Sequence, residues 1–142
     1  MTIAAILSSK GSDVATVPSG TIVRDAVTLL AEKKIGALPV IGPAGILGIF
    51  SERDLVQSIA EQGSGVLDWP IERVMSAPVE TVETSTPILS ALGTMTQRRM
   101  RHLPVVERGE IRGIVSIGDL VKYRIERIEA EADALRTYIQ SA

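Results

Sequence analysis

Apolar positions along the chain follow two spacings, one typical of helices and one typical of buried strands. Val23, Val27 and Leu30 recur every three or four residues, which places them on one face of a helix. Short runs rich in Val, Ile and Leu, separated by turns with Gly or Pro, instead indicate strands joined as hairpins. The predicted order in the first half is a strand at 14–17, a helix from Val23, strands at 37–41 and 46–50, and a helix from Asp54.

The second half repeats this pattern. Segments 14–56 and 79–121 align without a gap, and the match resumes upstream, where 71–76 aligns with 3–8 after one slip near 10–13. Self-similarity of this kind predicts one supersecondary unit used twice. The most similar stretches are Leu38-Pro39-Val40 with Leu103-Pro104-Val105, and Gly48-Ile49-Phe50-Ser51 through Asp54-Leu55 with Gly113-Ile114-Val115-Ser116 through Asp119-Leu120.

The repeat divides the chain into four predicted segments. These are a first repeat at 1–62, a connection at 63–70, a second repeat at 71–124 and a C-terminal helix at 125–142. The predicted fold class is α+β, with two β-α-β-β-α repeats followed by the additional amphipathic helix. Because a half of about 60 residues buries little apolar surface alone, we expect the two halves to fold together. Trp69 in the connection is interpreted as a packing anchor.

The C-terminal segment carries an apolar stripe at alternating spacings of four and three residues, which is typical of a helix with one apolar face. Its members are Val121, Ile125, Ile128, Ala132, Leu135 and Ile139. Two interpretations stay open: the helix packs on its own repeat, or it associates with a second copy or a partner helix.

Composition and charge argue against several function classes. The formal net charge is −2, which does not favour binding to nucleic acid or to an anionic membrane. No apolar run approaches the roughly 18–20 residues of a membrane span, and no signal peptide is evident, so we expect a cytoplasmic protein. The chain has no cysteine, a single histidine and no recognisable catalytic or metal-binding motif. These features predict a protein that is not an enzyme and has neither a catalytic cofactor nor a metal.

Candidate chemistry lies where each repeat joins a strand to a helix, at Ser51 with Asp54 and at Ser116 with Asp119. Such a serine can cap the helix, and an acid in the first turn is stabilised by the helix dipole. The same pair can bind a ligand, because a carboxylate accepts hydrogen bonds from vicinal ribose hydroxyls and a serine donates to phosphate or sugar. Both interpretations stay open at this point.

Two blocks occur in both repeats, namely Leu-Pro-Val and Gly-Ile-x-Ser-x-x-Asp-Leu, and a further block at 71–76 opens the second repeat. Together they resemble a tandem pair of cystathionine β-synthase (CBS) domains over roughly residues 3–124. The resemblance implies two lobes related by a pseudo-twofold axis, with facing sheets and two clefts between them. It further implies a stand-alone regulatory protein of bacterial type whose clefts bind AMP, ADP, ATP or NAD as a regulatory ligand. It also implies a homodimer.

By position, the resemblance assigns the ribose hydroxyls to Asp54 and Asp119, with Ser51 and Ser116 near ribose or phosphate. The remaining implied ligand contacts are Met75, Glu80, Thr81 and Met100 for the Asp54 cleft, and Ala15, Thr16 and Ile35 for the Asp119 cleft.

The two copies differ at positions that suit phosphate. Arg101 and His102 stand where the first copy has Gly36-Ala37, and Arg53 stands where the second has Gly118. Arginine suits phosphate through its planar array of donors. We therefore expect the Asp54 cleft, with Arg53, Arg101 and His102, to be the better phosphate site.

The sequence thus predicts a ligand-sensing module that signals by rearrangement of its lobes or of a dimer, with its output going to the dimer itself or to an unidentified protein partner. The alternative is an interaction and dimerisation scaffold whose nucleotide sites are vestigial.

Overall fold

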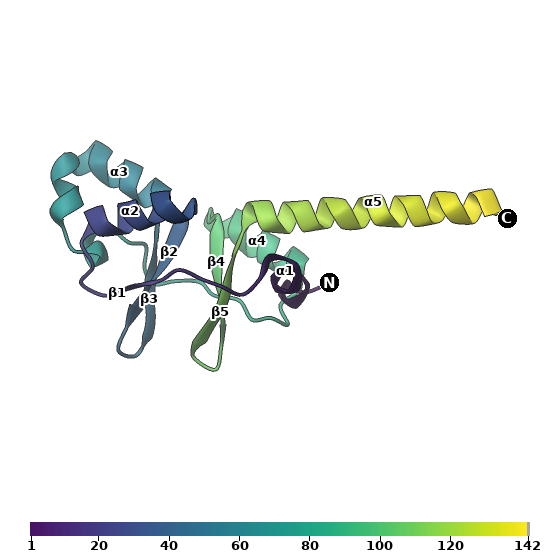
Figure 1. Ribbon diagram of the computed structural model, residues 1–142, viewed down its shortest axis with the longest axis horizontal. Coiled ribbons are helices and arrows are strands. Elements are labelled where there is room, and N and C mark those ends of the chain that lie inside the picture. Colours follow the sequence, from purple (N-terminus) through teal and green to yellow (C-terminus); the bar gives the residue numbers. More distant parts are fainter. Residues whose placement is uncertain (142) are drawn as a thin grey trace. The chain divides into compact units, whose positions relative to one another are not determined.

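The computed structural model describes residues 1–141, so the final residue of the predicted C-terminal helix, Ala142, lies outside the described residues. The chain forms two compact units, each coloured by sequence position in Figure 1. The first unit consists of Met1–Ser12, Val82–Glu107 and the chain from Ile111 onward; the second consists of Asp13–Thr81 with Arg108–Glu110. Each unit therefore combines most of one repeat with the opening block of the other.

The second unit contains the predicted β-α-β-β-α order of the first repeat. Strand β1 (Val17–Pro18) pairs in parallel with β2 (Ala37–Gly42), which pairs antiparallel with β3 (Gly45–Ser51). Helix α2 (Val23–Lys33) connects β1 to β2, and α3 (Glu52–Gln62) follows β3 directly. The first strand is shorter than the predicted 14–17 because only its last residue, Val17, and Pro18 pair with β2.

The core of the second unit is mainly aliphatic. The predicted face of α2 is buried at Val23 and Leu30 and packs with Phe50 of β3. Two short 3₁₀ helices, η1 (Ser64–Asp68) and η2 (Ile71–Arg73), complete this core. The predicted connection is therefore part of the packed structure: Val66 and Ile71 are fully buried, and Trp69 packs against the same cluster, as predicted.

The first unit contains the second repeat. Helix α4 (Ile88–Arg98) precedes the hairpin of β4 (His102–Glu107) and β5 (Glu110–Ser116), and α5 (Ile117–Ser141) follows without a break. The predicted last helix of the repeat and the predicted C-terminal helix are thus one continuous helix. The N-terminal helix α1 (Ile3–Lys10) belongs to this unit.

Because 79–121 repeats 14–56, the strand predicted at 14–17 implies another at 79–82, and that strand is not formed. Only Val82 of this segment makes ladder hydrogen bonds: its N–H donates to the Pro104 carbonyl (3.0 Å) and its carbonyl accepts from the Val106 N–H (2.9 Å). A single parallel bridge between Val82 and Val105 results. The apolar run predicted a strand, but one paired residue is too short to be one.

Equivalent backbone contacts attach the opening blocks to both units. The N–H of Ile3 donates to the Thr86 carbonyl (3.0 Å), and the N–H of Ile71 donates to the Thr21 carbonyl (2.8 Å). Ile3 and Ile6 are buried in the first unit's aliphatic cluster, as Ile71 is in that of the second. The opening block of each repeat therefore completes the core formed by the strands of the other.

Two aligned glycines, Gly48 and Gly113, provide a test of this packing. A Cβ on Gly48 would lie 2.6 Å from the Ser76 carbonyl oxygen, whereas a Cβ on Gly113 would meet the flexible end of Leu7 at 2.8 Å. We expect Gly48→Ala to lower the free energy of unfolding by about 1–3 kcal/mol, because backbone cannot move aside cheaply. Gly113→Ala should cost clearly less in urea unfolding, and equal losses would contradict the packing described.

Candidate functional site

Ser51 and Asp54 form a reciprocal cap at the junction of β3 and α3. The N–H of Asp54 donates to the Ser51 hydroxyl (3.2 Å), while the N–H of Ser51 donates to Oδ2 of Asp54 (2.9 Å). The Ser51 hydroxyl also lies 3.1 Å from the same Oδ2. This capping box satisfies helix donors that would otherwise lack partners and holds the half-buried carboxylate at the positive end of α3.

Ser76 of the second unit also contacts the Asp54 carboxylate, although nothing in the sequence pattern pointed to it. Its hydroxyl donates to Oδ1 of Asp54 at 2.8 Å. Its backbone pairs with Ile49 of β3 through two hydrogen bonds, of 2.8 and 3.0 Å. The Asp54 carboxylate is therefore held by neutral donors on both oxygens.

The junction of β5 and α5 in the first unit has the same cap. The N–H of Ser116 donates to Oδ2 of Asp119 (2.8 Å), and the N–H of Asp119 donates to the Ser116 hydroxyl (3.1 Å). The matching geometry means that the capping interpretation holds for both copies. It leaves open the second role, because a carboxylate offers about four acceptor positions.

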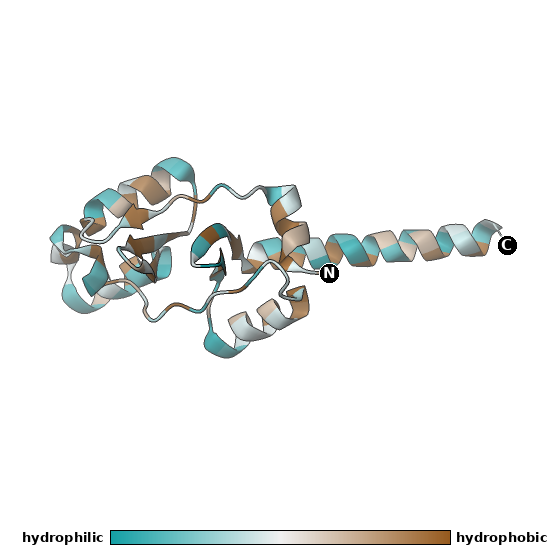
Figure 2. Cartoon of the chain, turned by 90° about the horizontal axis from the view of Figure 1, so that it is seen from below, coloured by the Kyte–Doolittle hydropathy of each residue, from teal (hydrophilic) through white to brown (hydrophobic). Residues whose placement is uncertain are grey.

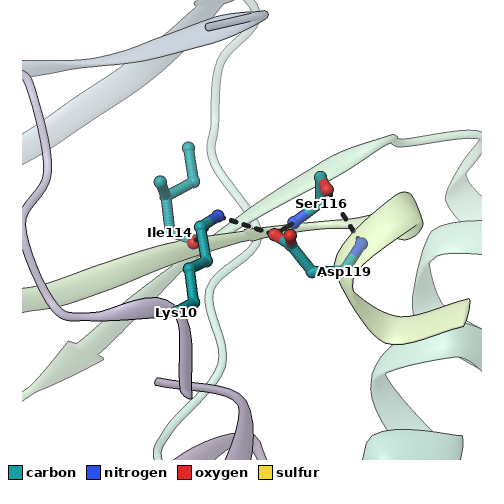
Figure 3. A network of polar contacts seen from close by, with 4 residues as sticks. All are labelled: Lys10, Ile114, Ser116 and Asp119. Carbon is teal, nitrogen blue, oxygen red and sulfur yellow. Dashed lines mark hydrogen bonds and ion pairs between the residues drawn. The ribbon is translucent and has the colours of Figure 1, made fainter. Parts of the chain in front are cut away.

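Lys10, at the end of α1, contacts Asp119 in the first unit (Figure 3). Ser76 makes the comparable contact with Asp54 in the second unit. The Lys10 ammonium lies 2.6 Å from Oδ2 of Asp119 and donates to the Ile114 carbonyl at 2.8 Å. In the second unit, the N–H of Ser76 donates to the corresponding Ile49 carbonyl. One ammonium thus replaces both the hydroxyl and the N–H of a serine, and it adds a positive charge.

Opposing effects act on the ionisation of Asp119. Partial burial acts to raise the pKa of its carboxyl group, but hydrogen bonds from Lys10 and Ser116, together with the Lys10 charge, outweigh burial and hold that pKa below its usual value. Asp119 is therefore a carboxylate at neutral pH, paired with a cation whose side chain is 36% exposed.

The other predicted residues of the second unit lie around its core and surface. Ala15, Ile35 and Met75 pack against the aliphatic cluster, whereas Thr16 and Thr81 are exposed. Arg53 is exposed in the first turn of α3, beside Asp54 in sequence. The contact of these six residues with a ligand stays a prediction.

In the first unit, Arg101 immediately precedes β4 and contacts the first residue of α5. Its carbonyl accepts a hydrogen bond from the N–H of Ile117 at 2.8 Å, next to Ser116 and Asp119. Its side chain is exposed, while Met100 packs against the core and His102 begins β4 half-buried. The assignment of these three residues to the Asp54 ligand stays a prediction.

The second unit also has an open hollow of about 410 Å³. It is lined by Val27, Leu30, Ala31, Lys34, Ile35, Glu52 and Leu55. Ile35 is the only predicted site residue among them. The lining is mostly apolar, and neither Ser51 nor Asp54 contributes to it.

Within residues 1–141, no helix is both long and apolar enough to cross a membrane. In the same residues, no group of three or more His, Asp or Glu side chains is arranged to hold a metal ion.

The family model of the CBS domain matches the chain twice, over residues 5–61 and 71–126. The chain belongs to the CBS domain family. The resemblance deduced from the repeated blocks is thereby confirmed, and so is the α+β fold class. The two CBS domains follow the sequence repeat, whereas the compact units exchange the opening blocks.

Known CBS proteins cover most of the chain. A mitochondrial CBS domain-containing protein of Arabidopsis thaliana is 34% identical over 123 residues, which are 83% of this chain; the chain spans 60% of that protein's length. The crystal structure of a CBS-domain containing protein from Agrobacterium tumefaciens is similar at 38% identity with a TM-score of 0.83, covering 87% of this chain and 99% of that one. A CBS domain protein from Pyrobaculum aerophilum, solved in complex with AMP, is similar at 26% identity with a TM-score of 0.74, covering 84% and 89%.

The ion pair of Lys10 with Asp119 predicts a pH-dependent contribution to stability. A carboxyl group whose folded pKa is depressed stabilises the fold fully above its unfolded pKa, near 3.8, and loses that contribution as pH falls through the lower folded value. Lys10→Met should therefore raise the pKa of Asp119 in an NMR titration of the carboxyl carbon. It should also lower the melting temperature at neutral pH. The difference in melting temperature between this variant and the wild type should become smaller in acid.

Lys33→Met, which removes an equal charge from the second unit, serves as the control and should leave the pKa of Asp119 unchanged. An unchanged Asp119 pKa in Lys10→Met would show that the pair does not form in solution.

Proposed function

We propose that this protein is a regulatory module that senses an adenosine-containing ligand, with the ribose hydroxyls bound by the capped aspartates. The observation that carries the proposal is the placement of Asp54 and Asp119, two half-buried carboxylates fixed by identical caps at strand–helix junctions. The complex of the similar Pyrobaculum aerophilum protein with AMP supports the ligand class. AMP, ADP, ATP and NAD share the adenosine moiety and all fit this description.

The caps leave acceptor capacity for a sugar. In the first unit, the Ser116 and Lys10 bonds both use Oδ2 of Asp119, so Oδ1 is the oxygen toward which a ribose hydroxyl would donate. In the second unit, Ser76 donates to Oδ1 of Asp54 through a hydroxyl that can rotate toward another acceptor. Vicinal hydroxyls donating to an ionised carboxylate form charge-assisted hydrogen bonds, which are stronger than neutral ones.

The two junctions differ in the charge of the group that already contacts the carboxylate. At Asp54 this group is one neutral hydroxyl, whereas at Asp119 it is an ammonium, whose positive charge weakens the carboxylate as a hydrogen-bond acceptor even though it leaves Oδ1 open. We therefore assign the tighter ribose site to Asp54. The guanidinium of Arg53, exposed beside it, is available to a phosphate.

Binding becomes a signal only if the ligand prefers one of at least two arrangements of the protein. In this proposal, adenosine binding biases the arrangement of the two units or of a dimer, and the output passes to a second copy or to a protein partner. The proposal includes no reaction and no catalytic cofactor.

A second candidate function, an interaction scaffold with vestigial sites, is favoured by the caps themselves. The bonds of Ser51 with Asp54 and of Ser116 with Asp119 account for these residues without any ligand. A scaffold shows no change in melting temperature with nucleotides. A bound ligand at 100 times its Kd instead adds about 2.7 kcal/mol to the free energy of unfolding.

The difference in affinity between the Asp54 site and the Asp119 site can be measured with a matched pair of variants. We expect Asp54→Asn to weaken the binding of AMP about 10- to 100-fold, because one charge-assisted acceptor is worth about 1.5–3 kcal/mol. Asp119→Asn should weaken it less. Isothermal titration of both variants and the wild type measures these changes, and thermal unfolding without ligand checks that each variant is folded.

Equal losses in the two variants would contradict the assignment of the tighter site to Asp54. A wild type that binds none of AMP, ADP, ATP and NAD would instead favour the scaffold.

A further inference from the structure

The last helix bears an apolar stripe that stays exposed. Among the described residues of α5, only Leu120 is buried. The stripe residues beyond it have exposed fractions of 44–64%: Val121, Ile125, Ile128, Leu135 and Ile139. Figure 1 shows α5 continuing past α1 and α4 of its own unit, and Figure 2 shows apolar residues recurring along it among polar ones.

The spacing of the stripe is that of a coiled-coil seam. With Ala132, these residues occupy the a positions at 125, 132 and 139 and the d positions at 121, 128 and 135, and none of the six is charged. The two ion pairs within the helix, Arg127 with Glu131 and Asp133 with Arg136, lie outside the seam. A helix of 25 residues that exposes such a face in water loses the burial that normally stabilises helices.

We propose that this stripe is the seam of a parallel, in-register, two-stranded coiled coil formed with a second copy of this chain. This interface goes beyond the proposed ligand sensing and does not depend on it. The second copy is the occupant because the charges that flank the stripe complement themselves.

In a parallel pair, a residue at g faces the residue at e of the following heptad on the other helix. Arg124 (g) then faces Glu129 (e) of the second copy, and Glu131 (g) faces Arg136 (e). Both contacts join opposite charges, and twofold symmetry repeats each of them. Every pair of charged residues at successive g and e positions along the stripe is therefore attractive.

An antiparallel pair with the same overlap juxtaposes like charges. There, g residues face g residues and e residues face e residues, so Glu129 and Glu131 would each meet their own counterparts and Lys122 would meet Arg136. Like charges at such positions are unfavourable. The charge pattern thus selects the parallel orientation.

The interface is tested on the full chain by sedimentation equilibrium. Ile128→Asp places an unpaired charge in the centre of the seam and should raise the dimer dissociation constant on the order of a hundredfold or more. Its matched control is Ala130→Asp, two residues away on the outer face, which should leave the dissociation constant within about threefold. Circular dichroism confirms that both variants are folded. A monomeric wild type, or equal effects of the two substitutions, would overturn the proposal.

Orientation is tested by cysteine crosslinking, since the natural sequence has no cysteine. Leu135→Cys lies in the seam and, in a parallel in-register dimer, meets its own counterpart, so mild oxidation should link most chains into disulfide dimers. Thr137→Cys, on the outer face of the same turn, should remain uncrosslinked. Failure of Leu135→Cys to crosslink, or equal crosslinking at Thr137, would overturn the parallel seam.

Discussion

The burial of the two opening blocks is the constraint on which the rest of the structure depends. Ile3 and Ile6 fill the core of the first unit, and Ile71 and Val74 fill that of the second, so neither sheet has a complete core from its own repeat. Burial of a side chain of this size stabilises a fold by about 1.5–3 kcal/mol. The exchange of blocks therefore makes the halves interdependent, as the small size of each half led us to expect.

The same exchange supplies the groups that contact the two carboxylates. α1 ends at Lys10 and thereby delivers an ammonium to Asp119, and the block that begins at Ile71 delivers the hydroxyl of Ser76 to Asp54. The two caps match, but Lys10 carries a positive charge and Ser76 is neutral. The packing of the opening blocks thus determines the charge beside each carboxylate. This difference in charge is the physical basis for assigning the Asp54 and Asp119 sites unequal affinities for the ligand.

The parts of the fold predicted from sequence are those fixed by local pattern and repetition. The face of α2 and the hairpins depend on residues a few positions apart, and they form as predicted. The caps at Ser51 and Ser116, one of the two interpretations left open for these residues, are equally local and also form. The prediction of a strand at 79–82 was wrong, because an apolar run cannot show that only Val82 pairs with a neighbouring strand. Lys10 was missed because its contact with Asp119 joins residues 109 positions apart; the alignment slip near 10–13 marked the place without revealing the partner.

We propose that the carboxylate at each capped strand–helix junction binds the vicinal hydroxyls of an adenosine ribose. Isothermal titration of the wild type with AMP and with 2′-deoxy-AMP tests this proposal most directly, since the two ligands differ by one hydroxyl and keep the same base and phosphate. The deoxy compound should bind about tenfold or more weakly, because one charge-assisted hydrogen bond is lost. Equal affinities for the two compounds would contradict it.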